Sequence, residues 1–178
     1  MRVIASALVT AIALFFFGFI WWGILMPIVK PAEVITDQAV VDSMNSTFSG
    51  SGVYFYPDPA TASEATSGPW AILYFDPNMP DMGSMMGMGF GHMLLTAFAA
   101  TLFVRFRNLP TFADRFKFVA GLGLFVALWA DIGNMIWWHH PTPWAVFHFG
   151  YDLLSWVLAG AIIAAIMKPC PQKETSAT

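Results

Sequence analysis

Charge is scarce in this sequence. Only 11% of its 178 residues are Asp, Glu, Lys or Arg, whereas 57% are apolar. A chain of this length that folds in water cannot bury so much hydrocarbon without leaving large apolar patches on its surface. The lack of charge therefore argues against a water-soluble globular protein and favours a lipid environment.

Cysteine and the common catalytic motifs are also lacking. Cys170 is the only cysteine, so no disulfide can form within the chain, and we expect a free thiol. The sequence contains no nucleophile elbow, phosphate-binding loop, dinucleotide fingerprint or HExxH motif. We therefore expect that this chain alone is not an enzyme.

Long apolar runs are what the sequence has instead. A helix needs roughly 20 apolar residues to cross a hydrocarbon core of about 30 Å, and four runs meet that length: 3–29, 83–104, 116–138 and 143–167. The first run is too long for the apolar core of a secretory signal, so we expect it to be retained. The sequence predicts an all-α membrane protein, a four-transmembrane-helix bundle that forms a single domain over residues 1–178.

Basic residues gather on one side of these runs. One precedes the first run, four lie in the connection from the second run to the start of the third, and two follow the fourth: Arg2, Arg105, Arg107, Arg115, Lys117, Lys168 and Lys173. The positive-inside rule then places both termini in the cytoplasm. We expect a multi-pass protein of a bacterial inner membrane with the lipid bilayer around it. The opposite side holds Lys30 and is otherwise acidic, which argues against nucleic acid as a partner.

The connection over residues 30–82 is the only long segment expected outside the membrane. Apolar residues near helical spacing in residues 34–44 predict a short amphipathic helix on the membrane surface. The runs SGVYFYP and GPWAILYF, separated by DPATASEATS, predict a β-hairpin with a loose loop. This extracytoplasmic part is too small to be an independent enzyme domain.

Glycine and methionine dominate the start of the second run, NMPDMGSMMGMGFGHMLL. Gly83, Gly87 and Gly91 recur at every fourth residue, a pattern that predicts close packing against another helix.

The methionines of this stretch allow two interpretations. Methionine is a flexible apolar filler in membrane helices, but its thioether is also a soft ligand for Cu(I). Met85, Met88 and His92 lie on one helical stripe and, with His148, form a candidate copper or zinc site. Haem with His92 and His148 as axial ligands has no other support in the sequence.

Two carboxyl groups lie deep inside the last two runs. Asp131 lies in ALWADIGNMIWW and Asp152 in FHFGYDLLSW, and at 1.5 Å per residue each is about 12–13 Å below the outer end of its helix. Asn134 lies one turn from Asp131, and His148 one turn from Asp152 with Tyr151 beside it. Ionisable groups at membrane depth are functional candidates.

Three roles are open for this intramembrane polar pair. Asp131 and Asp152 can share a proton, because ionising both in a low dielectric is costly. They can support a metal site, or they can form a hydrogen-bonded clasp between adjacent helices. The clasp is slightly favoured. His139 and His140 lie in WWHHPTPW, where an aromatic belt is expected, and their expected role is interfacial anchoring.

Three stretches resemble parts of small uncharacterised bacterial inner-membrane proteins with four predicted spans. They are FFFGFIWWGILMP, SGVYFYPDP and FHFGYDLLSWVLAGAIIAA, at both ends of the chain and in the outer loop. The resemblance implies a four-span inner-membrane protein and carries no activity with it.

The leading functional hypothesis is a non-enzymatic accessory or scaffold component of an inner-membrane assembly. Its partners would be other membrane-protein subunits or further copies of the same chain. The first alternative is a periplasm-facing protein that binds or handles copper or zinc. The second is proton-linked or small-ion transport through the aspartate pair.

Overall fold

The chain divides into two compact units. A computed structural model describes residues 1–58, 60 and 68–168, so the predictions for Cys170, Lys173 and most of the hairpin loop fall outside the described residues. The helical unit comprises Met1–Ala32 and Gly83–Thr178, and the hairpin unit comprises Glu33–Met82.

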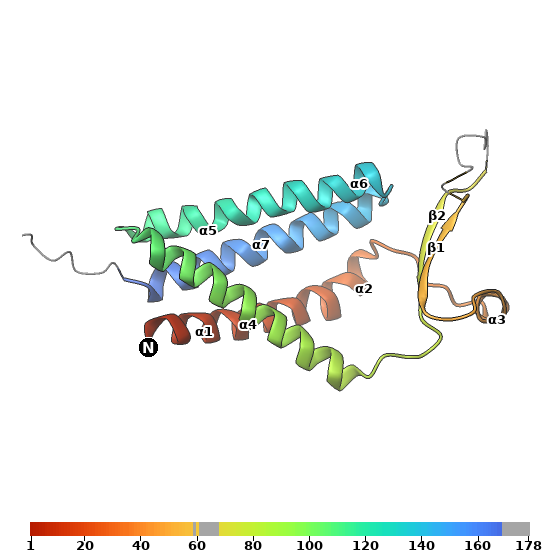
Figure 1. Cartoon of the computed structure of the whole chain (residues 1–178), viewed down its shortest axis with the longest axis horizontal. Coiled ribbons are helices and arrows are strands. Elements are labelled where there is room, and N and C mark those ends of the chain that lie inside the picture. The colour runs from red at the N-terminus through yellow and green to blue at the C-terminus, as the bar shows by residue number, and fades with distance from the viewer. Residues whose placement is uncertain (59, 61–67, 169–178) are drawn as a thin grey trace, which may run out of the picture. The chain divides into compact units, whose positions relative to one another are not determined.

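Four long helical segments build the helical unit (Figure 1). They are long and apolar enough to cross a membrane, and they span Arg2–Val29, Met82–Arg107, Phe112–Trp137 and Thr142–Ile166. The prediction of four such helices is confirmed, with ends within a few residues of those expected.

Two of these segments are interrupted by π-helical turns. In chain order the segments are α1 (Arg2–Gly18), η1 (Phe19–Leu25) and α2 (Met26–Val29); α4 (Met82–Arg107); α5 (Phe112–Ala127), η3 (Leu128–Ile132) and α6 (Gly133–Trp137); and α7 (Thr142–Ile166). The π-helical turns are η1 and η3. Such turns are rare and often lie at functional sites.

The helical unit has two chemically different ends. The start of α1, the end of α4, the start of α5 and the end of α7 lie together at one end (Figure 1), which we call the basic end because Arg105 and Arg107 lie in the last turn of α4. The opposite end carries Trp22 in η1, Trp137 at the end of α6 and Trp144 in the first turn of α7. We call it the tryptophan end.

Close packing is concentrated toward the basic end. One buried cluster joins α4, α5 and α7 there, and it consists of Ala100, Val104, Val119, Ala159, Ile163 and Met167. Val119 and Ile163 are completely buried, with 0% exposure. A hydrogen bond of 3.3 Å between the hydroxyls of Ser6 and Thr101 links α1 to α4.

The closest approach between helices is made by glycines of α5 and α7. A Cβ atom placed on Gly123 would lie 2.0 Å from the Cβ of Trp156, a distance that no side chain can occupy. A Cβ atom on Gly160 would lie 3.3 Å from the carbonyl oxygen of Phe116. These two helices therefore depend on glycine for their separation.

The close helix packing expected along the glycine repeat of Gly83, Gly87 and Gly91 is not observed at Gly87 or Gly91. A Cβ atom on Gly87 or Gly91 would have nothing within 4 Å among the described residues. Among the described residues, Gly87 and Gly91 therefore make no close helix contact. Gly91 instead lines an open groove together with Ile4 and Leu8 of α1.

Arg115 is a buried side chain at the basic end that donates hydrogen bonds to backbone carbonyls. Its side chain is only 7% exposed. The Nε donates to the carbonyl oxygen of Ala164 at 3.2 Å, and Nη1 donates to those of Leu109 at 2.9 Å and Pro110 at 3.1 Å. Arg115 was expected only as one of the basic orientation residues, and the structure gives it a role in closing the end of α7.

A capping box begins the same helix. The Thr111 hydroxyl accepts from the backbone N–H of Asp114 at 3.1 Å, and the Asp114 carboxylate accepts from the backbone N–H of Thr111 at 3.2 Å. This reciprocal pair satisfies the first free N–H groups of α5 and fixes where the helix starts.

The hairpin unit contains the predicted helix and hairpin. Helix α3 (Gln38–Thr47) begins at Asp37, whose carboxylate accepts from the backbone N–H of Ala39 at 2.9 Å. Strands β1 (Gly52–Tyr56) and β2 (Ala71–Phe75) pair antiparallel, with Gly52 opposite Phe75. The helix and the antiparallel strand pair are therefore confirmed, whereas the position of the helix on a membrane surface stays a prediction.

An aromatic cluster holds the hairpin unit together. The ring of Phe48 lies 4.3 Å from that of Tyr54 and 5.1 Å from that of Phe75, measured between centroids. At the end of β2 the backbone N–H of Asn78 donates to the Asp76 carboxylate at 2.9 Å. That hydrogen bond, with one from Ser51, holds the pKa of Asp76 below its usual value.

Candidate functional site

His148 lies between two indole rings at the tryptophan end. Its ring centroid is 4.8 Å from that of Trp22 and 4.4 Å from that of Trp144. Its Nε2 atom is buried without a hydrogen bond partner among the described residues. Aromatic packing therefore fixes the position of this imidazole, and one of its nitrogens is left without a protein partner.

Tyr151 continues this aromatic group one turn deeper. Its ring stacks on Phe17 with centroids 5.8 Å apart and an interplanar angle of 5°. The hydroxyl oxygen approaches Gly18 so closely that a Cβ there would lie 3.1 Å away. The side chains of Trp22 and Ser155 are its polar neighbours, although Ser155 Oγ has no partner that meets strict hydrogen-bond geometry.

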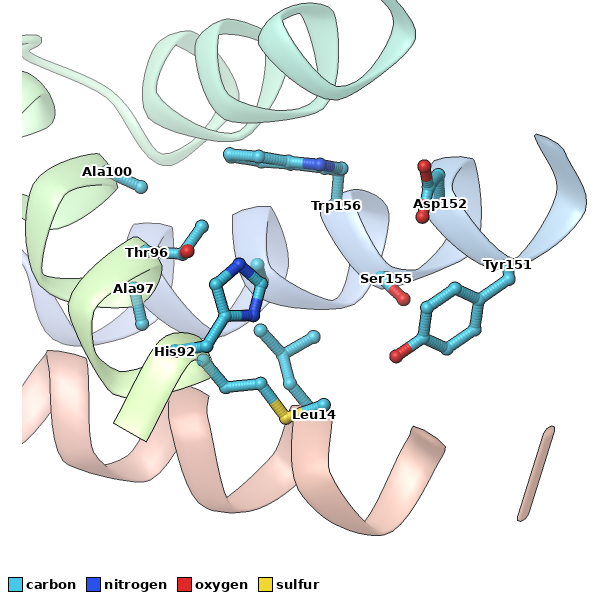
Figure 2. Close-up of a pocket in the computed structure, with 11 residues that line it drawn as sticks. Leu14, His92, Thr96, Ala97, Ala100, Tyr151, Asp152, Ser155 and Trp156 are labelled. Carbon is cyan, nitrogen blue, oxygen red and sulfur yellow. The ribbon is translucent and has the colours of Figure 1, made fainter. Parts of the chain in front are cut away.

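A cavity of about 140 Å³ lies between α1, α4 and α7. Its polar lining comes from His92 and Thr96 of α4 and from Tyr151, Asp152 and Ser155 of α7. In Figure 2, His92 reaches in from α4, Asp152 and Trp156 project from one stripe of α7, and Tyr151 and Ser155 project from the next. The remaining lining, including Leu14 and Met93, is apolar.

The two predicted carboxyl groups come from η3 and α7, which contact each other. Asp131, in η3, is only 6% exposed. It is near enough to Asp152 of α7 for the two charges to interact. Asp152 lines the cavity, whereas Asp131 does not. One carboxyl is therefore at the cavity and the other is buried, and a functional pairing of the two stays a prediction.

Neither carboxyl has a compensating partner. Among the residues that the structure describes, neither Asp131 nor Asp152 makes a hydrogen bond or an ion pair, and Asp131 Oδ2 is a buried acceptor without a donor. The hydrogen-bonded clasp with Asn134, His148 and Tyr151 is therefore not observed. A buried carboxyl without a donor is costly when it is ionised.

Of the polar neighbours predicted around the pair, Asn134, His139 and His140 do not line the cavity. The backbone carbonyl of Asn134 accepts from the N–H groups of Trp138 at 3.1 Å and His140 at 3.3 Å, which closes α6. His139 has a positive φ of 50° in the turn that follows. These histidines form the connection between α6 and α7 and do not line the cavity.

The candidate metal ligands do not share one cavity. His92 lines the cavity and His148 does not. The side chains of Met85 and Met88 are 46% and 66% exposed. Over residues 1–58, 60 and 68–168, no group of three or more His, Cys, Asp or Glu side chains is arranged to hold a metal ion. Copper or zinc binding stays a prediction.

The π-helical turns were missed by the sequence reasoning. Turn η1 carries Trp21 and Trp22, and turn η3 carries Asp131. Both therefore supply residues to the site that α7 completes. A π-helical turn is a shift of backbone hydrogen bonds, so composition and apolar periodicity carry no signal for it.

Comparisons with known proteins add no assignment. No family model matches the chain, and no significant match was found among curated proteins or solved structures. The resemblance to small four-span bacterial membrane proteins is neither confirmed nor refuted.

Proposed function

We propose that this chain is a non-enzymatic, multi-pass membrane protein that takes up and releases a proton at the Asp131–Asp152 pair. One observation carries the proposal: two carboxyl groups lie together inside candidate membrane-spanning helices without a hydrogen bond or ion pair among the described residues. In this proposal the four segments form a bundle in the bilayer.

The chemistry of the pair supports proton binding. Two negative charges at one place in a low dielectric repel each other and lose their hydration, and a single shared proton relieves both costs. Asp152 lines a cavity that water can enter, whereas Asp131 is buried and does not line it. A proton from the cavity therefore reaches Asp152 first.

The orientation of the protein follows from its two ends. Arg105, Arg107 and Lys168 lie at the basic end, which we place in the cytoplasm together with both termini. The tryptophan end then faces the periplasm of a bacterial inner membrane, and the site belongs to the outer half of the bundle.

Infrared difference spectroscopy tests proton binding directly. We expect a protonated-carboxyl C=O band that titrates with pH in the purified protein and is lost in Asp131→Asn and Asp152→Asn. Glu33→Gln is the matched control, because it removes an exposed carboxyl outside the spans. A spectrum in which the band is absent, or is unchanged in both Asn variants, would overturn the proposal.

Flux measurements decide whether the proton crosses the membrane. In proteoliposomes that contain a pH-sensitive dye, transport predicts a proton flux that Asp131→Asn abolishes. Titration of the band without any flux would assign the pair to proton binding alone.

An accessory role in a membrane assembly is the second candidate, and a different observation favours it. The α4 stripe at Gly87 and Gly91 has open space beside it, and the neighbouring Met85 and Met88 are exposed. Small residues of this kind allow a second helix to approach closely, either from another subunit or from a second copy.

Purification from native membranes tests this role. We expect a partner or a homo-oligomer that Gly87→Leu disrupts, while the matched Gly121→Leu in α5 leaves it intact, because Gly121 also lies in open space. Recovery of the chain only as a monomer from native membranes would contradict the accessory role. Metal analysis of the same preparation tests the copper or zinc hypothesis.

A further inference from the structure

We propose that the cavity between α1, α4 and α7 binds a lipophilic organic cation, whose positive group pairs with Asp152 against the ring of Trp156. This inference rests on the proposed function, because it uses the same carboxyl that exchanges the proton. It adds a ligand class to the site: a monovalent ammonium group that carries apolar substituents.

The charges around the cavity favour a cation. Its lining includes no Lys or Arg. The titratable groups that face it are His92 from α4 and Tyr151 and Asp152 from α7, and α1 contributes none. The cavity therefore has a carboxyl group in its wall, with the charge of Asp131 acting on that carboxyl from outside the lining, and no fixed positive charge to balance them.

The lining distinguishes an organic cation from a metal ion. Calcium and magnesium need about six or more oxygen ligands to replace their hydration shells, and the apolar Leu14, Met93 and Ala97 cannot supply them. An ammonium group with apolar substituents is already weakly hydrated. It gains from contact with these side chains and with an aromatic face.

Aromatic side chains stand next to the carboxyl. Asp152 and Trp156 are one helical turn apart on α7 and both line the cavity, and Figure 2 shows them on the same side of that helix. Tyr151 lies on the adjacent stripe. A carboxylate combined with aromatic rings is the arrangement that recognises ammonium groups.

The size of the cavity limits the ligand. Its volume is about 140 Å³, and an engineered apolar cavity of about 150 Å³ in another protein accommodates benzene. A phenyl ring or a small quaternary ammonium group therefore fills it, and any larger substituent extends through the open side.

Binding of benzyltrimethylammonium to the full-length protein in lipid nanodiscs tests the proposal. The control ligand is neopentylbenzene, which has the same shape with carbon in place of the charged nitrogen. We expect Asp152→Asn to weaken binding of the cation about tenfold or more and Trp156→Leu to weaken it roughly tenfold. Glu33→Gln removes a carboxyl outside the spans and should leave the affinity unchanged.

The pH dependence supplies an independent readout. A proton and the cation compete for Asp152, so affinity should fall as the pH is lowered, by up to about tenfold per pH unit where the pair titrates. Binding should also release a proton from the protein, which a pH dye in weakly buffered solution detects.

The outcomes separate this inference from the proposed function. Equal affinity for neopentylbenzene, or full affinity in Asp152→Asn, would show that the cavity selects shape alone and would overturn the inference. An absence of cation binding while the infrared carboxyl band still titrates would overturn the inference and leave proton binding intact. Absence of a titrating carboxyl band from the unsubstituted protein would overturn both.

Discussion

The two ends of the helical unit differ in how completely their polar groups are satisfied. At the basic end Arg115 donates to three backbone carbonyls, a capping box begins α5, and Val119 and Ile163 are fully buried. Toward the tryptophan end the chain forms two π-helical turns and a cavity, and Asp131 and His148 keep buried atoms without partners. Satisfied hydrogen bonds and full burial stabilise a fold, whereas a cavity with unpaired buried polar atoms is typical of a functional site.

The largest effect on stability is expected at the closest contact between α5 and α7. Gly123→Ala places a methyl group 2.0 Å from the Cβ of Trp156, so α5 and α7 must separate. We expect a loss of roughly 3 kcal/mol or more in the free energy of unfolding, measured by thermal unfolding in mild detergent. Gly121→Ala is the matched control two residues away in open space, and it should be neutral or stabilising by up to about 1 kcal/mol. Equal behaviour of the two variants would contradict the packing described for Gly123.

The next effect tests the basic end itself. Arg115→Met replaces the guanidinium group by an apolar side chain that is nearly as long. The carbonyls of Leu109, Pro110 and Ala164 then lose their donor. The expected cost is about 2 kcal/mol of unfolding free energy. Lys117→Met removes a basic residue from the exposed side of the same helix and should change stability by less than about 0.5 kcal/mol. A small effect of Arg115→Met would mean that the arginine serves orientation alone.

A change of opposite sign is expected at the tryptophan end. Asp131→Asn removes a buried charge that lacks a partner and repels Asp152. We expect thermal stability at neutral or alkaline pH to rise by about 1 kcal/mol while proton binding is lost. A loss of stability would indicate instead that the carboxyl is held by hydrogen bonds, as in the clasp that the sequence favoured.

The smallest expected effect concerns α4. Gly91→Ala adds a methyl group where nothing lies within 4 Å, so the isolated chain should keep its stability or gain up to about 1 kcal/mol from the higher helix propensity of alanine. Thermal unfolding of the purified chain measures this. A clear loss of stability would show that this face is packed within the chain after all.

The sequence was sufficient for the four long helices and the hairpin, because these depend on length and period. It was insufficient to predict which neighbour each helix face contacts, because a run that is apolar on all sides does not indicate how the helix is rotated about its axis. Gly87 and Gly123 are equivalent as residues, and only their neighbours distinguish them. Arg115 was misjudged for the same reason, since a basic residue near a helix end can point outward or inward.

The contact between Gly123 and Trp156 also affects how the cavity binds. The Cβ of Trp156 is held against the backbone of α5 at Gly123, while its ring forms part of the cavity wall. The ring is therefore preorganised, and a ligand that packs on it does not have to immobilise it first. Immobilising a side chain with several rotamers costs about 0.5–1.5 kcal/mol on binding, and the fixed indole avoids that entropy loss.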